Sequence, residues 1–265
     1  MKKITILLLA ALLALSLCAC VADEEDPNHI DDYAAPDYTH SISTGTVTFE
    51  EGYAESAVIV GYTGLSTPHK VVIPPEIAER EVSGIGKEAF YQLSMVSEIE
   101  LPDTVTFIGE FAFAGCTSLT TITIPESVTY IDAYAFAGCT ALETVIFKGK
   151  SVESIGDFAF LNCTALDTIK LPEGVKSIGK QTFGKCTALT SFKTPSTLES
   201  IDNLAFYGCE GLNADGALEL SASIKEIGEF AFSGISKKYI VAPADSYAAD
   251  YVSKMADDEE SETEE

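Results

Sequence analysis

A phrase of six residues, Ile-(Gly/Asp)-x-x-Ala-Phe, recurs along this chain at a nearly constant interval. A fixed period of about 20–50 residues is typical of a solenoid, in which each stacked coil contacts only its neighbours. The repeat therefore predicts one elongated domain whose function lies on a shared surface and not in a central pocket. The gaps between its phenylalanines are 23, 23, 24, 23, 23 and 26 residues, for Phe90, Phe113, Phe136, Phe160, Phe183, Phe206 and Phe232.

The second coil illustrates how one repeat is expected to fold. Thr and Ile alternate over Leu119–Ile124, just before a proline, which predicts a short strand with one buried face. Gly109, whose place is taken by Asp in two other coils, tolerates unusual backbone angles and can begin a helix. We expect Glu110–Ala114 to form one short helical turn, with Phe113 filling the interior of the coil.

The combined pattern, Ile-Gly-x-x-Ala-Phe-x-Gly-Cys-Thr-x-Leu-x-x-Ile-x-Leu-Pro-x-x-Val, resembles the BspA-like class of leucine-rich repeats over Ile85–Ile240. Tyr62–Gly64 and Val71–Pro74 resemble the N-terminal cap of that class, and Val241–Tyr247 resembles its closing segment. The resemblance implies an α/β repeat solenoid, a right-handed coil with a concave parallel β-sheet, short helical turns and a β-rich N-terminal cap. It also implies a non-catalytic, surface-exposed bacterial protein used for adhesion or binding, and it fixes no ligand.

The N-terminal segment predicts a secreted protein that is anchored by lipid. Two lysines precede an apolar run over Ile4–Leu17, which is typical of a secretory signal and shorter than the ~20 residues of a membrane-spanning helix. The run ends in Leu17-Cys18-Ala19-Cys20, which resembles a bacterial lipobox. Cys20 is therefore the predicted lipidation site, and the alternative is an ordinary cleaved signal with two incidental cysteines. The lipid would be the protein's sole attachment to the membrane, at the extracytoplasmic cell surface.

Acidic segments flank the repeat region and set the predicted domain boundaries. Residues 20–45 and 257–265 each hold seven Asp or Glu and no Lys or Arg, so we expect a disordered spacer and a disordered tail that keep the protein soluble. Between them lie an N-terminal cap (46–84), seven repeat units (85–240) and a C-terminal cap (241–256). The net charge of −25 argues against nucleic-acid binding, because phosphate groups would be repelled.

Five cysteines occupy the same place in consecutive coils: Cys116, Cys139, Cys163, Cys186 and Cys209. Zinc ligands usually come as close pairs, and these are each a whole coil apart, so the spacing disfavours a metal site. Neighbouring coils could bring two cysteines to disulfide distance, but the number is odd. We favour a ladder of buried, reduced thiols that act as small apolar side chains, with disulfides as the alternative.

The sequence carries no pattern that indicates catalysis. His29, His40 and His69 lie outside the repeats, so no Ser-His-Asp or Cys-His pair can form on the coil. Phosphate-binding glycine loops and zinc-binding helix motifs are also absent from the sequence. We therefore predict a protein without enzymatic activity, metal or cofactor.

The outward residues of the predicted strands form the candidate binding surface, because repeat coils present extended concave faces to their partners. The alternative is that these residues are simply good strand formers on a wet sheet. We call the following eight residues the Thr/Lys face: Thr121, Thr123, Thr144, Ile146, Thr168, Lys170, Ser191 and Lys193.

A second stripe of large side chains stands two residues before each repeat phenylalanine. It could be an exposed binding stripe, but packing between adjacent turns is the favoured interpretation. The stripe comprises Phe111, Tyr134, Phe158, Leu204 and Phe230, and Glu88 and Gln181 interrupt it.

Two functions remain open on the sequence. The first is a monomeric, lipid-anchored adhesin that binds a protein, or a glycan, of a host or neighbouring cell. The second is an envelope scaffold that acts by self-association. A carbohydrate-binding module of an uptake system is a weaker third hypothesis.

Overall fold

The computed structural model describes residues 38–255, apart from 43–44, 65–66, 68 and 215–216. The predicted signal, Cys20, His29 and the acidic tail lie outside these residues. The described chain begins with an antiparallel N-terminal cap, in which β1 pairs with β2 and β2 with β3. Because β1 starts at Tyr38, β-structure begins inside the segment that was predicted as a disordered spacer. The cap elements are β1 (Tyr38–Ile42), β2 (Gly45–Glu51), the 3-10 turn η1 (Tyr53–Glu55), β3 (Ala57–Gly64) and β5 (Glu76–Ile77).

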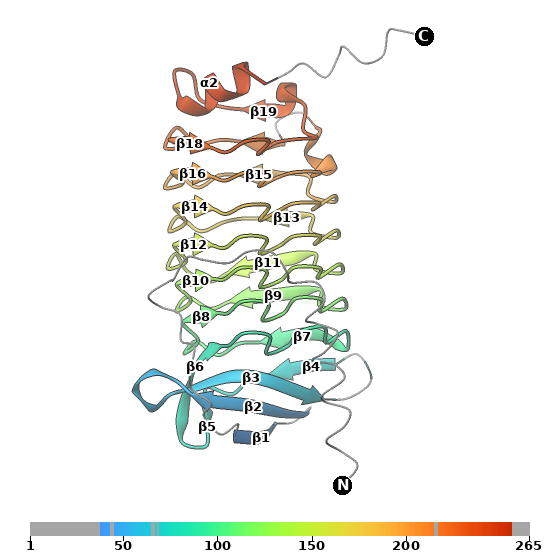
Figure 1. The fold of residues 1–265 in the computed structure, drawn as a ribbon, viewed down its shortest axis with the longest axis vertical. Coiled ribbons are helices and arrows are strands. Elements are labelled where there is room, and N and C mark those ends of the chain that lie inside the picture. Colours follow the sequence, from blue (N-terminus) through green and yellow to red (C-terminus); the bar gives the residue numbers. More distant parts are fainter. Residues whose placement is uncertain (1–37, 43–44, 65–66, 68, 215–216, 256–265) are drawn as a thin grey trace, which may run out of the picture. The chain divides into compact units, whose positions relative to one another are not determined.

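From β3 onward the chain winds into coils, and one short strand from each coil adds in parallel to an 11-stranded sheet (Figure 1). The register is one repeat per strand, so that Ile131 lies beside Ile108 and Ile155 beside Ile131. The sequence pattern missed this sheet, because two residues per coil are too few to show an alternating strand pattern. Its coil strands are β6 (Arg80–Ile85), β8 (Phe107–Ile108), β10 (Tyr130–Ile131), β12 (Ser154–Ile155), β14 (Ser177–Ile178), β16 (Ser200–Ile201) and β18 (Glu226–Ile227).

The strands that the sequence did predict form a second row of parallel strands. A five-stranded sheet holds β4 (His69–Val72), β7 (Val96–Glu100), β9 (Thr121–Ile124), β11 (Thr144–Phe147) and β13 (Thr168–Ile169). A three-stranded sheet holds β15 (Phe192–Lys193), β17 (Leu218–Glu219) and β19 (Ile240–Val241). A single bridge between Thr168 and Ser191 links the two sheets.

The segment expected as a short helical turn is not helical. In the second coil the amides of Ala112 and Ala114 donate to carbonyls three residues earlier, at 3.1 and 3.0 Å, as in β-turns. The amide of Phe113, which lies between them, donates instead to Ala135 of the next coil at 2.8 Å. An α-helix directs every amide along its own segment. Here alternate amides hold neighbouring coils together, which rules out the helix.

The unusual backbone angles also lie elsewhere than predicted. They occur in two series. Six residues after the Gly109 position, positive φ is found at Gln92, Gly115, Gly138, Asn162, Lys185, Gly208 and Gly234. Two residues after it, only non-glycine residues adopt positive φ, of 48° to 60°: Glu88, Phe111, Tyr134, Phe158, Gln181, Leu204 and Phe230. Such a residue costs about 1–2 kcal/mol. Glycine at the Gly109 position is explained by the close approach of neighbouring coils. A Cβ on Gly156, which holds this position in a later coil, would lie 2.7 Å from the amide nitrogen of Ala133.

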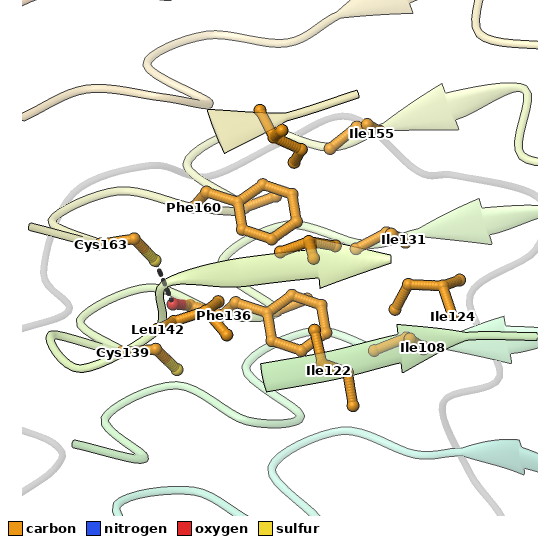
Figure 2. Packing of buried hydrophobic residues seen from close by; sticks show 14 of the residues in the cluster. Ile108, Ile122, Ile124, Ile131, Phe136, Cys139, Leu142, Ile155, Phe160 and Cys163 are labelled. Carbon is orange, nitrogen blue, oxygen red and sulfur yellow. Dashed lines mark hydrogen bonds between the residues drawn. The ribbon is translucent and has the colours of Figure 1, made fainter. Parts of the chain in front are cut away.

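The core is a stack of the seven repeat phenylalanines, all of them buried. Successive rings lie 5.2 to 5.8 Å apart between centroids, and most pairs are nearly parallel. Figure 2 shows Phe136 and Phe160 in this stack, among the isoleucines of the strands and the cysteines of the turns. Each coil therefore supplies one large ring to the interior, and in one coil Phe192 adds a second ring that contacts Phe183 and Phe206.

A short helix, α2 (Tyr247–Ser253), closes the last coil. Ser246 caps its N-terminus, and the Ser246 hydroxyl accepts a hydrogen bond from the amide of Ala249. Tyr251 of α2 packs edge-on against Phe232 at 5.9 Å and donates to the carbonyl of Gly228 at 3.0 Å. The helix thus covers the end of the phenylalanine stack. Two 3-10 turns, η2 (Glu210–Leu212) and η3 (Lys237–Tyr239), complete the described elements.

Replacing one ring in the middle of the stack should weaken the whole coil. We expect Phe136→Ala to lower the free energy of unfolding by about 3–5 kcal/mol, because it removes a buried ring and leaves a cavity. Urea unfolding followed by circular dichroism measures the change. The matched control is Phe230→Ala, where the ring is 67 % exposed and the loss should be about 0.5 kcal/mol or less. Equal losses for the two variants would contradict the role of the stack.

Candidate functional site

The structure brings the eight residues of the Thr/Lys face onto one surface, in two rows. Pairing in register sets Thr144 between Thr121 and Thr168 in the first row, and Ile146 beside Thr123 in the second. The residues between the rows, such as Ile122 and Val145, are buried, as expected when alternate residues of a strand point to opposite sides. Thr121, Thr123 and Thr144 are half-buried, and the other five residues are exposed.

Ion pairs between coils neutralise two lysines, Lys193 of the second row and Lys70, which lies in line with the first row. Lys193 reaches Glu219 on the next strand at 2.7 Å, and this hydrogen bond raises the pKa of the lysine. Lys70 pairs in register with Glu98, beyond Thr121 of the first row, and its hydrogen bonds to Glu100 and, at 2.9 Å, to Glu98 raise its pKa. The sequence did not indicate Glu219 as a partner, because an insertion in that coil separates it from Lys193 by more than one ordinary period.

Lys170 differs from its neighbours on the face. No salt bridge joins it, or nearby Lys150, to any residue in the described part of the chain. Both lysines act electrostatically on Glu173, whose pKa is lowered mainly by hydrogen bonds from Ser196 and further by these two charges. The amide and the hydroxyl of Ser196 donate to that carboxylate at 2.8 and 2.6 Å. Two cations are therefore left on this part of the surface without a bonded acid.

The five repeat cysteines are free and fully buried, in agreement with the favoured thiol ladder. Each thiol donates to the backbone carbonyl of the repeat phenylalanine one coil earlier, at 2.9 to 3.3 Å. Figure 2 shows this bond from Cys163 to Phe136. Burial raises the pKa of Cys116 and Cys209 to about 12 and that of the other three well above the usual value. The thiols are thus poor nucleophiles and act in packing.

Four residues of the stripe, Phe111, Tyr134, Phe158 and Leu204, are half-buried, and Phe230 is exposed. The rings of Phe111, Tyr134 and Phe158 stack at 4.6 Å between successive centroids, with planes 10° apart. The edge of Tyr91 covers one end of the stack at 6.2 Å, and the ammonium of Lys180 lies 5.7 Å from the Phe158 centroid at the other. Because their ring faces are occupied in this way, Phe111, Tyr134 and Phe158 offer mainly ring edges to a ligand. This supports the interpretation as packing between turns.

Other kinds of site find no support among the described residues. Within residues 38–255, outside the short gaps, no three His, Cys, Asp or Glu side chains are grouped so as to hold a metal ion. His69 accepts from or donates to Tyr62 at 2.8 Å and bonds the carbonyl of Thr67 at 2.7 Å, inside the N-terminal cap. No helix of this part of the chain combines the length and the apolar character needed to cross a bilayer.

We expect the five thiols to resist modification in the folded protein. In residues 20–265 carrying Cys20→Ala, these five are the cysteines that remain. At pH 8, Ellman's reagent should modify none of them within an hour in buffer and all five in strong denaturant, because buried thiols stay protonated and inaccessible. Thr117→Cys, next to Cys116 but exposed, should add one thiol that reacts at once. Fast reaction of a native thiol would contradict the ladder.

Comparison with known proteins agrees with the repeat and the fold. The model of the BspA type leucine rich repeat region matches residues 83–213 in six copies. A leucine-rich repeat protein from T. pallidum is 27% identical, with a TM-score of 0.66, and the match covers 77% of this chain and 92% of that one. No curated protein matches the chain.

Two larger proteins also match. A leucine rich cell surface protein from Faecalibacterium prausnitzii is 30% identical, with a TM-score of 0.62, over 77% of this chain and 54% of that one. A leucine-rich repeat protein from Bacteroides ovatus is 29% identical, with a TM-score of 0.54, over 75% of this chain and 58% of that one. The chain thus spans little more than half of these two proteins, and none of the matches indicates an enzyme family. The chain belongs to the BspA-type leucine-rich repeat family.

Proposed function

We propose that this protein is a non-catalytic, monomeric binding protein of the bacterial cell surface, and that the Thr/Lys face contacts a protein partner in adhesion to a host or neighbouring cell. The observation that carries the proposal is the pair of accessible rows on successive strands, in which chemically different side chains follow one another at a regular spacing. A repeat coil of this kind offers an extended surface and no enclosed site.

Attachment to the cell surface is part of the same proposal. The Leu17-Cys18-Ala19-Cys20 sequence supports cleavage before Cys20 and transfer of a diacylglycerol to its thiol. Two acyl chains hold a protein stably, where one chain binds only marginally. The similar protein from Faecalibacterium prausnitzii is described as a cell surface protein, which supports this location by similarity.

The binding role is tested by measuring the binding of the mature chain (residues 20–265, Cys20→Ala) to a panel of extracellular-matrix proteins, mucins and glycans, at low and high salt. We expect saturable binding to at least one protein that survives high salt, since binding through charge alone is screened. The double change Lys170→Glu and Lys193→Glu should weaken the binding of an acidic partner by about tenfold, if each reversed contact contributes about 0.5–1 kcal/mol.

The matched control is Lys176→Glu with Lys225→Glu. Both of these lysines are exposed and paired to a glutamate of a neighbouring coil, as Lys193 is, but they adjoin the 11-stranded sheet. Equal losses in the two double variants would contradict the face as the binding site. Concentration-dependent assembly of the mature chain, with no ligand bound, would contradict the adhesin hypothesis and support a self-associating scaffold. Saturable binding to a glycan alone would replace the protein partner.

The anchor is tested separately in the full chain expressed in bacteria. We expect the wild type to incorporate radiolabelled palmitate and to sediment with membranes, and Cys20→Ser to lose both properties because the acceptor thiol is gone. Cys18→Ser is the control, since that residue would leave with the signal. Lipid labelling that persists in Cys20→Ser would exclude this residue as the site.

A further inference from the structure

The corner at which the three-stranded sheet ends holds a hollow of about 380 Å³. It is lined by the last residues of β15, β17 and β19 and the residues that follow them, together with Glu173 of the preceding coil. Small residues explain why it opens here. Thr194 and Ala242 occupy the repeat position that Ile124 and Leu171 fill in earlier coils. The loss of side-chain volume in two of three successive coils leaves space beside the Thr/Lys face.

The wall of the hollow is mostly apolar. It consists of Leu220, Val241, Ala242 and Pro243, and Val241 is 51 % exposed. Its volume lies within the range of about 300–1,000 Å³ that is usual for ligand pockets. An apolar concavity on an otherwise acidic protein is suited to one bulky apolar side chain, and such anchors dominate the energetics of protein interfaces.

The polar groups around this wall are already bonded to one another. The Thr194 hydroxyl accepts from the amide of Ser221 at 2.7 Å, and the Ser221 hydroxyl lies 2.6 Å from that of Ser223. Ser196 is bonded to Glu173, as described above. A glycan would bring many hydroxyl groups that need partners, and leaving them unpaired is costly. The hollow therefore favours a protein ligand over a sugar.

The charges decide which protein ligand fits best. The carboxylates that line the hollow are bonded, Glu219 to Lys193 and Glu173 to Ser196. The lysines next to them, Lys170 and Lys150, have no salt bridge within the described residues. Lys170 stands one period before Lys193 in the same row, and its charge acts on Glu173, which lines the hollow, so the ammonium is near enough to attract a carboxylate of a partner.

We propose that this hollow and Lys170 together bind a protein segment in which a bulky apolar residue lies next to Asp or Glu. The apolar side chain enters against Val241 and Leu220, and the acid pairs with Lys170. This inference rests on the proposed function, because it names the place on the Thr/Lys side of the coil and the partner chemistry that the binding would use.

The test is selection from a phage library of random 12-residue peptides on the immobilised mature chain (residues 20–265, Cys20→Ala). We expect selected peptides to share a bulky apolar residue within two positions of Asp or Glu. For a peptide synthesised from the selection, Val241→Lys should weaken binding by about tenfold or more, because it places a charge on the apolar wall. Lys170→Glu should weaken it by about threefold or more, because it repels the acid.

Val72→Lys is the matched control. Val72 is 40 % exposed on β4, at the other end of the second row of strands and outside the Thr/Lys face, and the peptide should bind this variant within about twofold of the unsubstituted protein. A selection without the shared motif, or peptides that bind Val241→Lys as well as the parent, would overturn the inference. Loss of panel binding in Ile146→Lys but not in Val241→Lys would retain the Thr/Lys face and exclude the hollow. If motif peptides bind the hollow and no protein of the panel binds, the hollow would be retained and the proposed function would be contradicted.

Discussion

The hydrogen bonds between successive coils are the constraint on which the rest of this structure depends. In the turn segments every second amide donates to the next coil, and the two rows of strands add further bonds in the same direction. These bonds fix the spacing of the coils, and that spacing requires the repeat phenylalanines to stack at 5.2 to 5.8 Å. The left-handed residues follow from the same geometry, because successive amides of the turn must donate alternately to a carbonyl of their own coil and to a carbonyl of the next coil. The cost of about 1–2 kcal/mol at each is offset where aromatic rings stack, each pair contributing about 0.5–1.5 kcal/mol.

The same constraint explains why the cysteines are inert in spite of their number. Each thiol lies inside the turn that follows a phenylalanine and donates a second hydrogen bond to the carbonyl of the phenylalanine in the preceding coil. The same bond recurs five times because five coils place the same phenylalanine carbonyl, which already accepts a backbone amide of its own coil, next to the same apolar position. Leu93 and Ile235 occupy this place in the first and last coils, which shows that the site primarily needs an apolar filler. A protein proposed to reside outside the cytoplasm thereby keeps its thiols away from oxidants without pairing them.

Much of this could be predicted from the sequence, because burial leaves a periodic record. The 23-residue period gave the coil, the predicted Leu119–Ile124 strand corresponds to β9, and the place of the cysteines gave their role. The predictions were wrong where backbone geometry, and not burial, determines the local structure. Glu110–Ala114 looks helical, since no residue type reports where an amide points. Phe111 gives no sign of its positive φ, and the two-residue strand Phe107–Ile108 is too short to show alternation. For the candidate site, the rows of the Thr/Lys face followed from alternation, but the pairing of Lys193 with Glu219 depended on a register shifted by an insertion.

Selection for a repeating interior has a consequence for where function can lie. A residue that faces the core must suit the coils on both sides, so substitutions there are limited and adjacent coils resemble one another. Differences between coils therefore collect on the outside and near the ends. In this chain Thr194 and Ala242 interrupt a position that is large in earlier coils, and Lys170 lacks the bonded acid that Lys193 has. Both departures adjoin the same face of the coil. Since neither improves packing or charge pairing within the protein, a partner that supplies the missing apolar volume and the missing carboxylate gives both a physical reason.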